Sequence, residues 1–174
     1  MKRTARIIAT GAFLYALPAS AQMPPPGNDI AFTSFNEVSI NKALAPAKII
    51  AVKKTGSGGR TYFEIKIDNF NMILEPLDCK KDAPLQCPVA RLNAIVNLPK
   101  ATGAEAAKRT KMIAKMREFN RKDSFLKAYQ SGDRIIAVRY VNAAYGVHMG
   151  TVRTEISLFS KTFRSLIADY LRKS

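Results

Sequence analysis

The side chains with the greatest capacity for chemistry are two cysteines and one histidine. Cys79 and Cys87 are the only cysteines of the 174-residue chain, and His148 is its only histidine. The cysteines could form a disulfide or ligate a metal, but His148 alone is available to complete a metal site. The spacing of the two cysteines also differs from the Cys-x-x-Cys motif of redox-active pairs. We therefore expect a structural disulfide between Cys79 and Cys87, and no metal ligands.

Catalytic patterns are missing from the remaining polar residues. His148 has no serine, cysteine or carboxylate close to it in the sequence, and no nucleophile motif occurs. Residues 55–60 are rich in glycine but lack the spacing of a phosphate-binding loop. Carboxylates are spread along the expected strands in a way that suits charge balance for lysines: Glu64, Asp68, Glu75 and Asp78. From the sequence we expect no catalytic residue and no cofactor, and we expect that the protein is not an enzyme.

The first 21 residues have the pattern of a secretory signal peptide. Lys2, Arg3 and Arg6 precede an apolar run over residues 7–17, and small residues at positions 19–21 predict cleavage after Ala21. The run is shorter than the roughly 20 apolar residues of a spanning helix. We expect a periplasmic or secreted protein, in which the oxidising compartment favours the disulfide.

Removal of this segment leaves a strongly basic chain. The net charge of +15 falls to +12, because three of the removed residues are basic. A proline-rich tail over residues 22–28 precedes residues 29–174, which are enough for one domain. Such a charge attracts anionic partners, including a membrane surface bound only peripherally, or serves solubility alone.

Hydrophobic periodicity predicts an α+β domain. Its antiparallel sheet should have five to six strands, with helices packed on it, in the order α-β-β-β-β-α-β-β-α. The predicted helices are residues 29–44, a helix opened by the capping box at residues 102–105, and residues 151–174. The predicted strands are residues 48–53, 61–68, 72–77, 89–98, 125–130 and 134–143.

The second helix combines a buried stripe with a basic surface. Met112, Met116 and Phe119 recur at helical spacing and should face the core. A possible face for an anionic partner consists of Lys108, Lys111, Lys115, Arg121 and Lys122. The alternative is a solvated helix face. No aromatic residues interleave with these charges to stack bases, so nucleic acid is disfavoured as a partner.

Apolar residues of the last helix recur in alternating steps of four and three. They are Val152, Ile156, Phe159, Phe163, Leu166 and Tyr170. Such a narrow seam serves either as core packing or as the contact of a homodimer.

Several segments resemble the YbjN family of bacterial proteins, described as sensory transduction regulators. The helix-to-strand segment of residues 116–120, with Met116, Phe119 and Asn120, resembles the family's Ile-Asn-x-Trp-Asn pattern. Residues 125–129 resemble its next strand, and Gly146 and Val147 resemble its Gly-Val pair. Exported relatives also carry a cysteine pair before a strand. The resemblance implies a fold similar to type III secretion chaperones.

This resemblance favours binding over chemistry. The leading hypothesis is a noncatalytic exported adaptor, regulatory or chaperone-like, that recognises a protein or peptide through its sheet face or a helix groove. The alternative is an electrostatic binder of an anionic polymer or membrane surface through the basic helix face. We expect Phe119 to pack in the core beneath the following hairpin, and Asn120 to brace the junction between helix and strand.

Overall fold

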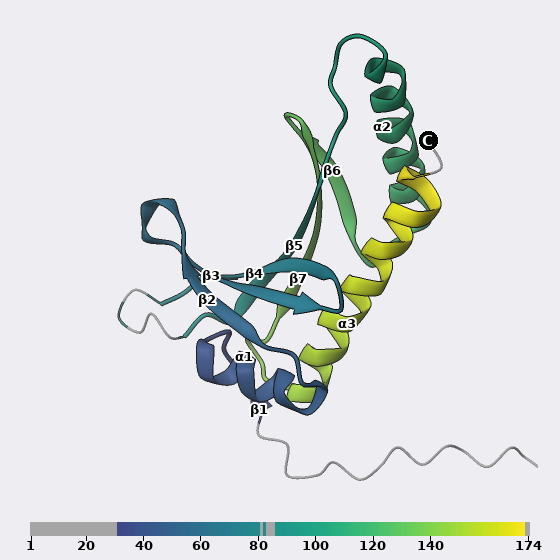
Figure 1. Ribbon diagram of the computed structural model, residues 1–174. Helices are drawn as coiled ribbons and strands as arrows, with labels where there is room; N and C mark the ends of the chain where they lie inside the picture. Colours follow the sequence, from purple (N-terminus) through teal and green to yellow (C-terminus); the bar gives the residue numbers. More distant parts are fainter. Residues whose placement is uncertain (1–30, 81, 83–85, 173–174) are drawn as a thin grey trace, which may run out of the picture.

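The computed structural model describes residues 31–80, 82 and 86–172 (Figure 1). The predicted signal peptide and proline-rich tail lie outside the described residues. Within the described part of the chain, no helix is long and apolar enough to span a bilayer.

A six-stranded antiparallel sheet forms the centre of the molecule. Its spatial order is β2-β3-β4-β5-β7-β6. The strands are β2 (Ala51–Thr55), β3 (Thr61–Ile67), β4 (Phe70–Leu77), β5 (Val89–Asn97), β6 (Lys127–Ser131) and β7 (Arg134–Asn142). The α+β class and the predicted order of the main elements are confirmed.

Three helices pack on one face of this sheet. They are α1 (Glu37–Leu44), α2 (Glu105–Lys122) and α3 (Met149–Ser165), and a π-helical turn, η3 (Leu166–Leu171), continues α3. Short 3-10 turns, η1 (Ala45–Ala47) and η2 (Ser57–Gly59), flank β2. Figure 1 shows α3 running diagonally across the molecule, with α1 near its start and α2 beside its end. The other face of the sheet is called the outer face below.

The N-terminal part differs from the prediction. Helix α1 begins at Glu37, where the Asn36 side chain accepts a hydrogen bond from the Ser39 amide at 2.9 Å. Before it, β1 (Ala31–Phe32) pairs with β8 (Val147–His148), and neither strand was expected. The prediction of a helix from residue 29 was wrong. The helical period of the apolar residues is weak in this segment, and residues 31–32 pair with β8 instead.

The starts of the other helices also differ. Helix α2 begins without the capping box, because Ala104 at its N-cap has no side-chain hydrogen bond. The Glu105 carboxylate instead accepts a hydrogen bond from the Lys100 amide at 2.9 Å. Helix α3 begins at Met149, two residues before the predicted start at residue 151.

Alternating strand residues and one stripe of each helix form a single core. Phe63 and Ile65 of β3, and Leu92 of β5, face the helices and are buried. Apart from the half-buried Tyr170, the apolar seam predicted for the last helix is buried within the same chain, as the core-packing alternative expects. Phe119 is buried as well and meets the Tyr170 ring edge-on at 5.4 Å between ring centres. The helices of the described residues thus cover one face of the sheet, and none of them lies over its outer face.

Candidate functional site

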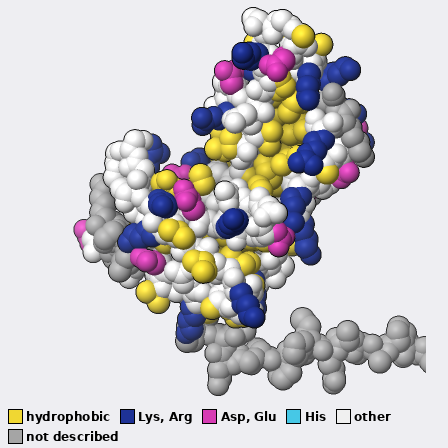
Figure 2. Space-filling model, viewed as in Figure 1, with side chains coloured by type: hydrophobic (Ala, Val, Ile, Leu, Met, Phe, Trp, Pro, Cys, Tyr) yellow, Lys and Arg dark blue, Asp and Glu magenta, His cyan; other side chains and the backbone are white. Residues whose placement is uncertain are grey.

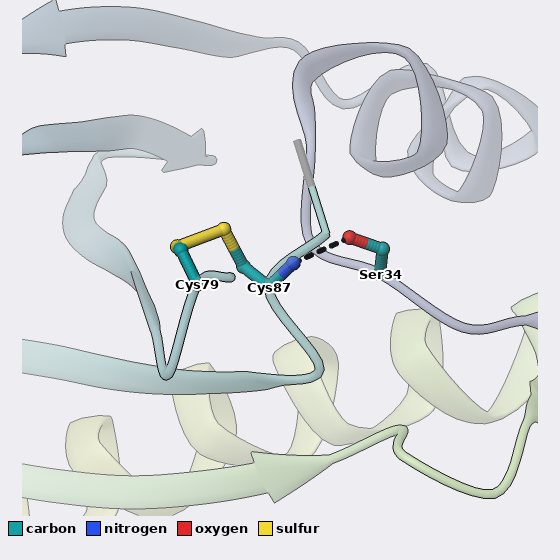
Figure 3. The surroundings of a disulfide bond; sticks show 3 residues. All are labelled: Ser34, Cys79 and Cys87. Atoms are coloured by element: carbon teal, nitrogen blue, oxygen red, sulfur yellow. Dashed lines mark hydrogen bonds between the residues drawn. A yellow bond between two sulfur atoms is a disulfide. The ribbon is translucent and has the colours of Figure 1, made fainter. Parts of the chain in front are cut away.

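The predicted disulfide between Cys79 and Cys87 is present and lies within the β4–β5 connection. The Cys87 amide donates a hydrogen bond to the Ser34 hydroxyl at 2.8 Å (Figure 3). The Phe35 amide donates to the Cys87 carbonyl, also at 2.8 Å. Ser34 and Cys87 are both buried. The disulfide therefore closes the β4–β5 connection, and the backbone of Cys87 fixes this connection to residues 34–35.

The other chemistry-bearing residues are not brought together. His148 lies exposed at the start of α3. Among the described residues, no group of three or more His, Cys, Asp or Glu side chains could hold a metal ion. Glu75 pairs with Arg91 and Arg60, and Asp68 pairs with Arg164. Arginines, not the expected lysines, therefore balance these two carboxylates.

The predicted basic face of α2 is exposed but partly neutralised. Lys115 and Lys122 each lie 2.8 Å from the Glu118 carboxylate. Hydrogen bonds from Lys115 and then Lys122 lower the pKa of Glu118 to about 2, and the same contact raises the pKa of Lys122. Arg121 is displaced from Lys122 by about 100° around the helix, so the five cations do not form one stripe. The face carries less free charge than its composition suggests.

A groove with a mixed polar and apolar lining adjoins this basic face. It has a volume of about 550 Å³ and lies between the end of β5, α2 and η3. Val96, Leu98 and Ile167 contribute apolar surface, while Glu105, Lys108 and Arg172 also line it. Figure 2 shows a hollow with an apolar floor at this end of the molecule, flanked by lysine and arginine side chains. The groove thus places two cations and one carboxylate beside apolar side chains.

The outer face of the sheet carries a second, larger apolar area. Cross-strand neighbours Ile95, Ile136 and Tyr129 form a row over β5, β7 and β6. Ile95 is 43% exposed and Tyr129 is 44% exposed. Two adjoining hollows of about 700 and 280 Å³ share Ile73 and Ile95 in their linings. Exposed branched and aromatic side chains in adjacent hollows are typical of protein-binding surfaces.

A polar row crosses the same face. Glu75, Arg91 and Tyr140 are successive cross-strand neighbours on β4, β5 and β7. The hydrogen bond to Glu75 raises the pKa of the Arg91 guanidinium. Tyr140 is 56% exposed beside this pair. The outer face thus combines apolar surface with a fixed ion pair, which can give a partner both affinity and orientation.

Asparagine side chains from two helices occupy the two edges of the sheet. Asn120 follows Phe119, the last buried residue of α2, and its side chain accepts a hydrogen bond from the Ala128 amide at 2.8 Å. It also donates to the Ala128 carbonyl at 2.6 Å. At the opposite edge, Asn41 of α1 accepts from the Ala51 amide at 3.3 Å. Asn120 therefore makes, at the helix–strand junction, the contact expected from its position.

Comparison with known proteins identifies the fold. No family of known sequences and no curated protein matches the chain. The crystal structure of YbjN from E. coli, described as a putative transcription regulator, superposes with a TM-score of 0.56 at 8% identity. The match covers 80% of this chain and 93% of YbjN. The chain has the YbjN fold. At 8% identity the likeness to YbjN concerns the fold alone.

Sequence reasoning missed the outer-face row and the contact of Asn41 with the edge strand β2. A signal for the row exists, because Ile95 and Ile136 fall on the more polar side of the alternation in β5 and β7. Asn41 gave no such signal, since one polar residue in a short helix is ordinary. Gly146 and Val147 lie at the turn into β8 and are structural, with Gly146 at a φ of 77°.

Proposed function

We propose that the chain is a noncatalytic, exported adaptor domain that binds a protein or peptide partner. The carrying observation is the outer face of the sheet, over which no described helix lies. Its exposed residues Ile95, Tyr129 and Tyr140 lie on three adjacent strands. The regulatory role suggested for YbjN is in keeping with a domain that acts by binding. The predicted signal peptide and the disulfide support export.

A capture experiment with matched variants tests this proposal. Immobilised wild-type protein should retain one specific partner from an extract of exported proteins at physiological salt. Ile95→Asp should lose that partner, because it puts a charge in the centre of the apolar row. Leu158→Asp is the control, since Leu158 on α3 is 41% exposed, close to the 43% of Ile95. Recovery of nothing above background, or equal retention by Ile95→Asp, would refute the proposal.

The second candidate is binding to an anionic polymer or membrane surface through α2. It is favoured by the groove in which Lys108 lies beside apolar residues. Its affinity for phosphatidylglycerol vesicles should fall steeply with salt, because exposed charges are screened over about 8 Å at physiological ionic strength. Replacing Lys108 and Lys111 by glutamine should also lower the affinity for these vesicles. Salt-insensitive binding, or none at low salt, would eliminate this candidate.

A further inference from the structure

Tyrosines and basic side chains share the outer face of the sheet. The tyrosines of the six-stranded sheet all point to this face, and they are Tyr62 of β3, Tyr129 of β6 and Tyr140 of β7. The phenylalanines of the same sheet, Phe63 and Phe70, lie on the helix side. Helix α2 carries cations without interleaved aromatic residues, whereas rings and charges lie together on the outer face. A sheet face with exposed rings and cations is typical of proteins that bind single-stranded nucleic acid.

The register of the sheet places a cation near each of these tyrosines. The pairs are Lys54 with Tyr62, Arg91 with Tyr140, and Arg134 with Tyr129. In the first two pairs the residues are directly opposite each other on neighbouring strands, and in the third they are diagonal neighbours. Side chains at such positions are close enough to contact one ligand. A base stacked on each ring would therefore have its phosphate within reach of a cation.

The charges of the outer face favour an anionic ligand. By the alternation of the strands, the outward basic side chains are Lys54, Lys66, Arg91, Lys127 and Arg134, and the outward acidic ones are Glu64 and Glu75. Five basic less two acidic side chains leave an excess of three positive charges. The loops that line the two hollows add Lys48, Arg60 and Asp68, which raises the excess to four.

Not all of these cations are equally available. The Lys127 ammonium donates hydrogen bonds to two carbonyl oxygens at the end of α2. Arg91 is paired with Glu75. Lys54 and Arg134 are exposed, and within the described part of the chain neither takes part in an ion pair. These two side chains are therefore the best placed to contact phosphates.

The hollow of about 280 Å³ on this face has room for one base. Tyr62 and Tyr129 both line it, although three strands lie between β3 and β6, so the curved sheet brings the two rings to one hollow. Asn93 of β5 also lines it and is only 9% exposed. Among the described residues, none is hydrogen-bonded to the Asn93 side chain. Its amide offers both a donor and an acceptor, as the edge of a base requires.

We propose that the outer face of the sheet binds single-stranded nucleic acid. Bases stack on Tyr62, Tyr129 and Tyr140, and one base edge bonds to Asn93. The inference goes beyond the proposed function, because it gives the same face a second ligand that is not a protein. The two ligands would compete for this face.

Fluorescence anisotropy with three labelled probes tests the stacking. The probes are an oligothymidylate of about twelve nucleotides, within the site sizes of small single-strand-binding domains, an abasic strand with the same number of phosphates, and a polyglutamate of similar charge. The purified protein should bind the oligothymidylate most tightly. Tyr129→Ala and Tyr140→Ala should each weaken this binding about fivefold or more, as expected for the loss of one stacked base. Tyr145→Ala is the control, because Tyr145 is 99% exposed but lies in the turn after β7.

The salt dependence of oligothymidylate binding tests the phosphate contacts. For a single strand, the slope of log K against log salt is about −0.7 for each phosphate neutralised. Joint replacement of Lys54 and Arg134 by glutamine should therefore reduce the slope by about 1.4. The matched control replaces Lys42 of α1 and Lys161 of α3, which are also exposed, and should leave the slope unchanged.

Four results would overturn the nucleic-acid proposal. They are equal affinity for the abasic strand, unchanged affinity of both tyrosine variants, tighter binding of polyglutamate, and no binding of the oligothymidylate at low salt. Tighter binding of polyglutamate would assign the face to an acidic polypeptide instead. The proposed adaptor function fails separately, through the captured partner and Ile95→Asp.

Discussion

Replacing Asn120 with alanine removes both hydrogen bonds to the backbone of Ala128. The two bonds measure 2.6 and 2.8 Å and join the last turn of α2 to the edge strand β6. Each net hydrogen bond contributes about 0.5–1.5 kcal/mol, so the variant should lose about 1–3 kcal/mol of unfolding free energy. For a domain of this size, the melting temperature should fall by about 3–12 °C.

Urea and thermal unfolding, followed by circular dichroism, measure this loss. Asn120→Asp keeps an acceptor for the Ala128 amide but cannot donate to its carbonyl, so it separates the two contributions. Asn71→Ala is the control, because Asn71 is an exposed asparagine of β4. It should change stability by less than about 0.5 kcal/mol, as surface substitutions usually do. If Asn120→Ala matched this control, the edge contact would have no energetic weight and the reasoning would be wrong.

Three further predictions concern stability. Cys79→Ser should cost the oxidised protein about 2–3 kcal/mol by the loop-entropy estimate and leave the reduced protein nearly unchanged, and equal melting in all samples would exclude a structural function for the bridge. Glu118 has a folded pKa of about 2, below its ordinary 4.5, so its contacts stabilise above about pH 4.5 and are lost as the pH falls toward 2. A melting difference between wild type and Glu118→Gln should therefore be present at pH 7 and absent near pH 2, and a pH-independent difference would contradict the lowered pKa. Phe159→Ala should lose about 3–5 kcal/mol in urea unfolding, because Phe159 is fully buried, whereas a loss below about 1 kcal/mol would show that the core relaxes around the cavity.

Local pattern predicted the main elements where it was regular. The alternation of Phe63 and Ile65 and the stripe of Met112, Met116 and Phe119 gave β3 and α2 close to their observed ranges. The pairing of β1 with β8 could not be predicted, because it joins two-residue strands that carry no period. The contact of Asn120 was expected from its place at the junction between helix and strand, whereas that of Asn41 depends on how α1 lies beside β2, which spacing along the chain does not encode. The candidate site, similarly, depends on which sheet face the helices leave open.

The pairing of β1 with β8 has a consequence for a chain that emerges from the ribosome N-terminus first. Ala31 pairs with His148, 117 residues later by the difference of their numbers. Phe32 and Phe35, each 1% exposed in the finished protein, belong to the core that α3 completes. Until the last helix has been synthesised, these two rings lack part of their native surroundings. A nascent chain stalled before residue 148 should therefore expose an aromatic segment to chaperones.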